Sequence, residues 1–161
     1  MLVEMTMQEL IRNTEQIPTE KRHHIADQVQ IVGGYHVQRI GESDLVFQAK
    51  TSTGHTAKIR AVVSETPSGG ASVELSDGTP MQFAPIATRA DDVQISCNCE
   101  DFYYRFAAVN SRYRVLFGEI TKPYIPKGPR MSDREPASDQ PAICKHVIKL
   151  THLLQSQGIM R

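Results

Sequence analysis

The chain has 161 residues, of which 40% are hydrophobic, so it is long enough to form one domain with a packed core. Tryptophan is absent and aromatic residues make up only 6%, which predicts a mainly aliphatic core. The formal net charge is zero, which argues against a dedicated nucleic-acid-binding protein, although residues 1–100 carry a balance of −5 and residues 101–161 a balance of +5.

Targeting signals and disulfides are also not indicated. No apolar run approaches the roughly 18 residues of a membrane span, and the start, "MLVEMTMQEL", lacks the basic and apolar stretches of a signal peptide. Three cysteines cannot all pair with one another, so a secreted disulfide scaffold is not expected. We therefore expect a protein of a reducing compartment, the cytoplasm, with no membrane partner.

Residues 1–34 read as a helical segment. Thr6 and Glu9 form a T-x-x-E capping box, in which each side chain satisfies a free backbone N–H group at the start of a helix. A second helix is predicted to begin at Pro18 and to end at the glycine pair 33–34. The expected apolar faces are Met7, Leu10, Ile11 and Ile17 in the first helix, and Ile25, Val29 and Val32 in the second.

Residues 35–96 read as antiparallel β-structure. Short, mostly alternating segments are separated by stretches typical of turns, such as "STGH", "TPSGG" and "SDGT". Successive hairpins are the simplest arrangement of such segments. The expected strands lie in "YHVQRI", "DLVFQAKT", "AKIRAVVS", "ASVELS" and "VQISC".

All three cysteines fall in two short pairs within residues 97–161, which we expect to form a zinc unit. Cys97 and Cys99 lie two apart at the end of a strand, where they point to the same face. Cys144 and His146 can converge if Cys144 precedes the final helix and His146 lies in its first turn, because two residues within a helix differ by about 200°. Three thiolates and one imidazole match a closed, tetrahedral structural zinc site with one Zn²⁺ per chain.

Two other interpretations of these residues are weaker. Unrelated buried thiols and a core histidine would leave the paired spacing unexplained. A catalytic zinc would keep one position open for water, whereas this motif supplies all four donors. No deaminase, Walker or dinucleotide-binding pattern is present. The chain is therefore expected not to be an enzyme and to have no small-molecule substrate.

The order C-x-C…C-x-H resembles the SWIM-type zinc finger. The resemblance covers the strand before Cys97, the continuation "CEDF", and "CKHVIKL" at the start of a helix. It implies a β–β–α zinc unit that binds DNA or proteins, with Cys97, Cys99, Cys144 and His146 as ligands. The interval of 44 residues between the pairs departs from the family, where it is far shorter. The chain is also similar to small structural proteins of tailed phages, through "DFYYRF" and "CKH" around a long insertion.

The insertion, residues 100–143, combines seven of the ten aromatic residues with several cations, and its second half holds five of the nine prolines. Three interpretations stay open for its aromatic part: core packing, docking onto a protein, and stacking on a single-stranded nucleic acid. A helix followed by a strand is expected over 101–120, with Phe102, Phe106 and Val109 as its buried face. The candidate partner-binding residues are Tyr103, Tyr104, Arg112, Arg114 and Tyr124.

Together these patterns predict an α+β fold in one domain of residues 1–161: N-terminal helices, an antiparallel sheet and a C-terminal zinc-clamped β–β–α unit. The expected function is that of a non-enzymatic structural or adaptor protein. It would dock onto a larger protein assembly or form a homo-oligomer, and it would belong to the virion if a phage encodes it. The alternative is a nucleic-acid-binding zinc module that uses the basic, aromatic insertion.

Overall fold

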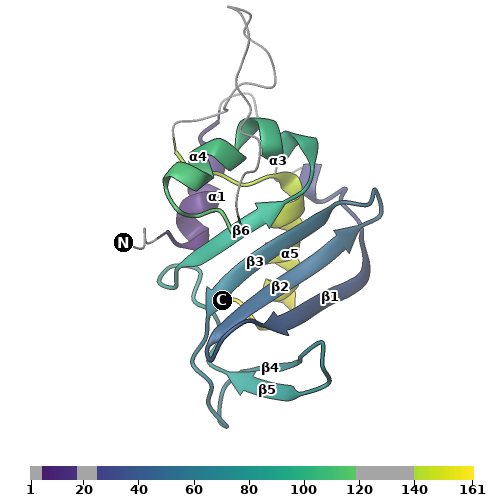
Figure 1. The fold of residues 1–161 in the computed structure, drawn as a ribbon, viewed down its shortest axis with the longest axis vertical. Helices are drawn as coiled ribbons and strands as arrows, with labels where there is room; N and C mark the ends of the chain where they lie inside the picture. Colours follow the sequence, from purple (N-terminus) through teal and green to yellow (C-terminus); the bar gives the residue numbers. More distant parts are fainter. Residues whose placement is uncertain (1–4, 18–24, 119–139) are drawn as a thin grey trace, which may run out of the picture.

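The computed structural model describes residues 5–17, 25–118 and 140–161, and it has the expected α+β architecture (Figure 1). The described helices are α1 (Met7–Glu15), α3 (Glu100–Arg105), α4 (Ala107–Arg112) and α5 (Lys145–Ser156). The strands are β1 (Ile31–Arg39), β2 (Asp44–Thr51), β3 (Thr56–Val62), β4 (Ala71–Glu74), β5 (Pro80–Phe83) and β6 (Val93–Cys97).

Four strands form one antiparallel sheet in the order β1-β2-β3-β6. The first three strands are joined by hairpins, while β4 and β5 form a separate two-stranded sheet before the chain returns as β6 beside β3. Figure 1 shows α5 crossing behind the larger sheet, with α1, α3 and α4 gathered beyond β6. The last strand and the last helix thus meet at the edge where the cysteines lie.

The core lies between the large sheet and α5. A row of cross-strand partners, Val37, Phe47, Ile59 and Ile95, runs across all four strands, and each of these side chains is buried. Helix α5 contacts all four strands. Its buried side chains include Val147, Ile148, Leu150 and Leu154. Burial of this aliphatic surface is the main stabilising term of the fold.

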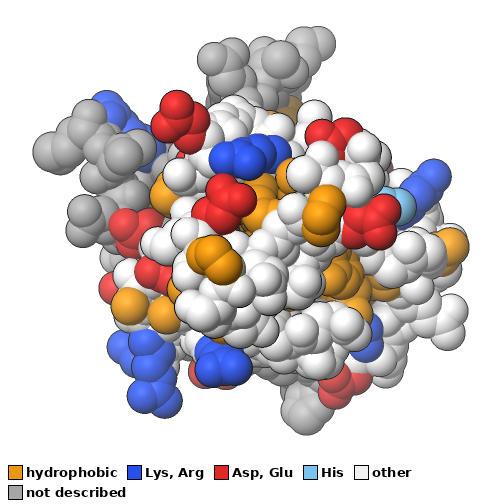
Figure 2. All heavy atoms as spheres, turned by 90° about the horizontal axis from the view of Figure 1, so that it is seen from below, with side chains coloured by type: hydrophobic (Ala, Val, Ile, Leu, Met, Phe, Trp, Pro, Cys, Tyr) orange, Lys and Arg blue, Asp and Glu red, His pale blue; other side chains and the backbone are white. Residues whose placement is uncertain are grey.

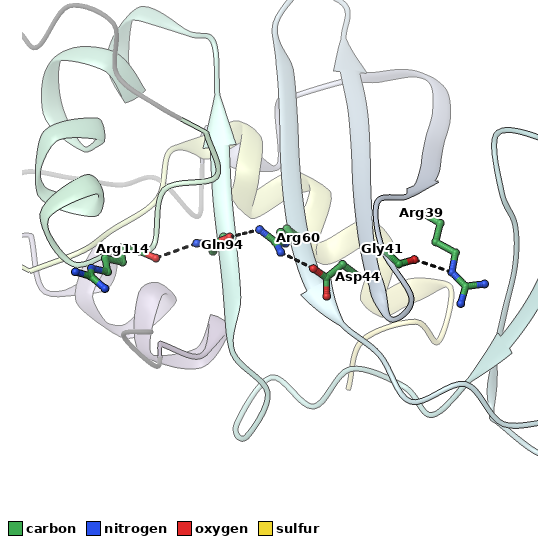
Figure 3. A network of polar contacts seen from close by, with 6 residues as sticks. All are labelled: Arg39, Gly41, Asp44, Arg60, Gln94 and Arg114. Atoms are coloured by element: carbon green, nitrogen blue, oxygen red, sulfur yellow. Dashed lines mark hydrogen bonds and ion pairs between the residues drawn. The ribbon is translucent and has the colours of Figure 1, made fainter. Parts of the chain in front are cut away.

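The opposite face of the sheet carries a chain of polar contacts, drawn in Figure 3. Arg60 pairs with Asp44 on β2 and donates a 3.0 Å hydrogen bond to Gln94 on β6. Gln94 in turn donates to the backbone carbonyl of Arg114, at 3.1 Å. These contacts tie three strands to the segment that follows α4.

The prediction of a second N-terminal helix is wrong within the described residues. Helical geometry at 25–26 gives way to a turn, and β1 begins at Ile31. Gly33 and Gly34, expected to end a helix, lie inside β1 with φ of +75° and +70°. They form a bulge where the register with β2 shifts. Residues 18–24 lie outside the described part of the chain.

Residues 101–118 also differ from the expected helix and strand. The helix is divided at Phe106, whose φ of −124° separates α3 from α4. The expected strand is reduced to one parallel bridge between Leu116 and Ile95. The buried face was predicted correctly, since Phe102, Phe106 and Val109 are each at most 3% exposed. Among the described residues, no helix combines the length and apolarity needed to cross a bilayer.

Candidate metal centre

The two ligand pairs are brought together from strand and helix ends. Cys97 is the last residue of β6 and pairs with Ala57 of β3, while Cys99 is the N-cap of α3. Cys144 is the N-cap of α5 and His146 lies in its first turn, as predicted. Each pair therefore sits where a regular element starts or stops.

The four side chains form one compact donor set. One ligand atom from each of Cys97, Cys99, Cys144 and His146 lies within 4.8 Å of all the others. The Cys97 Sγ atom is 3.6 Å from His146 Nδ1. Zinc bonds of about 2.3 Å to sulfur and 2.0–2.1 Å to nitrogen, at the tetrahedral angle, give a separation of about 3.6 Å. The spacing fits a metal bound through Nδ1.

The donor set is shielded from solvent. Cys99, Cys144 and His146 are at most 4% exposed, and Cys97 is partly buried. Ile143 and Val147, the sequence neighbours of Cys144 and His146, are fully buried. Burial of a thiolate is costly unless a partner satisfies its charge.

The contacts among the three thiols shift their pKa values in different directions. Hydrogen bonds from the Cys144 and Cys97 side chains lower the pKa of Cys99 far below its usual value, and the Phe102 N–H group also donates to its Sγ at 3.3 Å. Burial raises the pKa of Cys144. For Cys97, the contact with Cys144 lowers the pKa, but the hydrogen bond with Cys99 and burial raise it to about 12. These directions favour the thiolate form at Cys99 over Cys97 and Cys144.

The arrangement can bind a metal ion with four ligand atoms, one from each side chain. A borderline-soft ion that accepts thiolate and imidazole in a tetrahedron suits the set, and three sulfurs disfavour Mg²⁺ and Ca²⁺, which prefer oxygen. With all four positions taken by protein, the metal would tie β6 and α3 to α5.

The predicted partner-binding residues do not form a single patch. Tyr103 and Tyr104 are half-buried on α3, with ring centroids 5.0 Å apart, and they line a cavity of 410 Å³ beside Cys97 and Cys99. Arg112 and Arg114 are exposed near the end of α4 and do not line that cavity. Tyr124 lies outside the described residues.

The structure also places residues at the site that the sequence did not indicate. The ring of His55, expected only to lie in a turn, has its centroid 5.0 Å from that of His146. Asn110 and Thr14 are buried and form hydrogen bonds with the backbone just before Cys144. Nothing local distinguishes these residues, because their contacts join segments far apart in the chain.

Comparison with known proteins identifies no relative of this chain. No family model, curated protein or solved structure matches the chain.

Proposed function

We propose that the chain is a non-enzymatic protein stabilised by one structural Zn²⁺, and that it docks onto a larger protein assembly. The observation that carries the zinc assignment is the closed Cys₃His donor set, with all ligand atoms within 4.8 Å of one another. Such sites in proteins are structural, since no position is left for a substrate or a reactive water. The resemblance to the SWIM-type zinc finger supports the same assignment.

Docking onto a protein is favoured over nucleic-acid binding by the state of the aromatic residues. Phe102 and Phe106, which a nucleic-acid groove would present for stacking, are buried in the core. The half-buried Tyr103 and Tyr104 beside a cavity suit a protein interface, where tyrosine and arginine are enriched. Figure 2 shows the opposite end of the molecule, on the side of β4 and β5, where acidic and basic side chains are interspersed.

The partner is proposed to be a protein assembly, a tailed-phage particle if the second resemblance applies. The test is elemental analysis together with a mass measurement of the material as isolated from its native source. One zinc per chain in a particle much heavier than the 18.0 kDa chain is the expected result. A zinc-free chain contradicts the metal assignment, and a zinc-containing monomer without a partner contradicts docking.

A charge-reversal pair tests which surface docks. Arg112→Glu alters an exposed residue at the end of α4, one of the candidate partner-binding residues, whereas Arg89→Glu alters an exposed residue in the loop before β6. We expect the first variant to be lost from the assembly and the second to be retained. Equal retention of both would place the interface elsewhere.

The alternative, a nucleic-acid-binding module, draws on the exposed Arg112 and Arg114. It predicts retention of the purified chain on single- or double-stranded nucleic acid at about 50 mM salt, with affinity falling steeply as salt rises because counterions are released. Retention of this kind, weakened by Arg112→Glu but not by Arg89→Glu, would replace the docking proposal.

A further inference from the structure

The segment that leads into Cys144 is held in place by side chains from α1 and α4. We call this segment, Pro141–Cys144, the ligand arm. It is buried and has no regular secondary structure, so its backbone groups cannot be satisfied by a ladder of its own. Its position decides where the Cys144 sulfur and the start of α5 lie.

Asn110 of α4 holds the middle of the ligand arm. Its Nδ2 donates to the carbonyl of Ala142 at 2.9 Å, and its Oδ1 accepts from the N–H group of Ala142 at 3.1 Å. The side chain is fully buried. Both backbone groups of a residue two positions before Cys144 are thus paired with one amide.

Helix α1 holds the two neighbouring positions. Asn13 Nδ2 donates to the carbonyl of Pro141 at 2.9 Å. The hydroxyl of Thr14, 1% exposed, accepts from the N–H group of Ile143 at 3.0 Å while donating to Leu10. Four consecutive backbone polar groups of the ligand arm, from the Pro141 carbonyl to the Ile143 N–H group, therefore each have a side-chain partner.

Asn110 is also linked to the other ligand pair through its backbone. Its carbonyl accepts from Val115 N–H at 2.8 Å, and Val115 in turn accepts from Ile95 N–H at 2.8 Å on β6. The N–H group of Phe117 also donates a hydrogen bond, to the backbone carbonyl of Ile95. Since β6 ends at Cys97, Asn110 joins the strand that carries one ligand pair to the arm that carries the other.

We propose that Asn110 and Thr14 are positioning residues for the metal centre. By fixing the ligand arm against α1 and α4, they hold the four donors near their bound geometry in the folded, metal-free chain. Metal affinity then depends on these two side chains although neither contacts the metal. The inference rests on the proposed zinc site and adds to it that the site is formed before the metal binds.

The chain offers a matched pair of variants. Thr14 and Thr151 are both buried threonines, and each donates to the carbonyl four residues earlier in its own helix. Only Thr14 also accepts a hydrogen bond from the ligand arm. Thr14→Val therefore removes the link to the arm, while Thr151→Val repeats the same chemical change on α5 without touching Pro141–Cys144.

The experiment measures zinc affinity by competition with a chromophoric chelator, and the fold of the metal-free chains by circular dichroism. We expect metal-free wild type to be folded, Thr14→Val to bind Zn²⁺ about tenfold more weakly, as is typical when a residue supporting a ligand is lost, and Thr151→Val to bind as wild type. Asn110→Ala should weaken binding at least as much as Thr14→Val. If either threonine variant fails to fold, Asn110→Ala still tests the contact between α4 and the ligand arm.

Three outcomes overturn the inference: a metal-free wild type that is unfolded, wild-type affinity in both Thr14→Val and Asn110→Ala, or equal loss in Thr14→Val and Thr151→Val. Failure of the underlying site is distinguishable, because wild type itself would then bind no zinc. The Co²⁺-substituted protein supplies a further readout, since its visible spectrum reports the ligand geometry. A distorted spectrum in Thr14→Val beside a normal one in Thr151→Val is the expected result.

Discussion

Three thiols share one small volume at the metal centre, and they are not equivalent. The pKa of Cys99 is lowered by hydrogen bonds from Cys144 and Cys97, whereas that of Cys144 is raised by burial and that of Cys97 is raised to about 12. These directions favour one thiolate, at Cys99, and two thiols in the metal-free centre. A metal must displace the two remaining protons, because only the thiolate is a ligand.

The pH dependence of zinc binding follows from these protonation states. Cys97 and Cys144 keep their protons at pH values below their raised pKa, so we expect about two protons to be released for each zinc bound. The affinity for zinc should therefore rise about a hundredfold per pH unit near neutrality. Titration calorimetry in buffers of different ionisation enthalpy counts the protons. Cys97→Ser should reduce the count to about one, and an affinity independent of pH between about 6 and 8 would contradict the prediction.

At the scale of single elements, the start of α1 shows local sequence determining local structure. Thr6 Oγ1 accepts from Glu9 N–H at 3.3 Å, and Glu9 accepts from Thr6 N–H at 2.8 Å, so the capping box predicted from T-x-x-E is confirmed. The same helix carries Asn13 and Thr14 to the ligand arm. Its N-terminal cap therefore supports contacts made two turns later.

We expect Thr6→Ala to lower the free energy of unfolding by about 1 kcal/mol, because one N–H group at the helix start loses its acceptor. Chemical denaturation of both proteins in the presence of zinc measures the change. Glu9→Gln keeps an acceptor at the third helical position and should remain close to wild type. A destabilisation of Glu9→Gln as large as that of Thr6→Ala would mean that charge, and not the cap, matters here.

The features that the sequence predicted correctly depend on residues close together in the chain, whereas those it missed depend on contacts between distant residues. The donors Cys97, Cys99, Cys144 and His146 could be named because ligand chemistry and spacing are local properties. The end of the second helix could not be placed, since a glycine pair suits a helix stop and a β-bulge equally, and pairing with β2 decided for the bulge. Asn110 and Thr14 were missed because their partners lie 32 and 129 residues away.

For the molecule as a whole, the proposed zinc adds to a core that already joins the sheet to α5. The row from Val37 to Ile95 and the apolar face of α5 are buried without any contribution from the metal. The centre instead fastens one edge, where β6, α3 and α5 meet. Metal and core should therefore contribute separately to stability.

Zinc should raise the melting temperature of the metal-free chain without creating its secondary structure. A ligand at about 1,000 times its dissociation constant stabilises the folded state by about 4 kcal/mol, which corresponds to a rise of about 8–16 °C for a domain of this size. Calorimetry with and without a strong chelator measures the shift. The Cys144→Ser chain should show little response to added zinc, and a wild type whose melting is indifferent to the metal would contradict the prediction.

The contacts of the ligand arm imply that the fold does not depend on an unbroken chain between residues 118 and 140. Val115 and Phe117 form hydrogen bonds with Ile95 of β6, and Pro141 and Ala142 form hydrogen bonds with α1 and α4, so noncovalent contacts hold the chain on both sides of the interval 119–139. Two separate polypeptides, 1–118 and 140–161, should consequently associate when produced together. The bound ion would link them, because each fragment contributes two of the four ligands. Removing that ion would then shorten the lifetime of the pair, making fragment complementation a direct gauge of how firmly the centre holds the last helix.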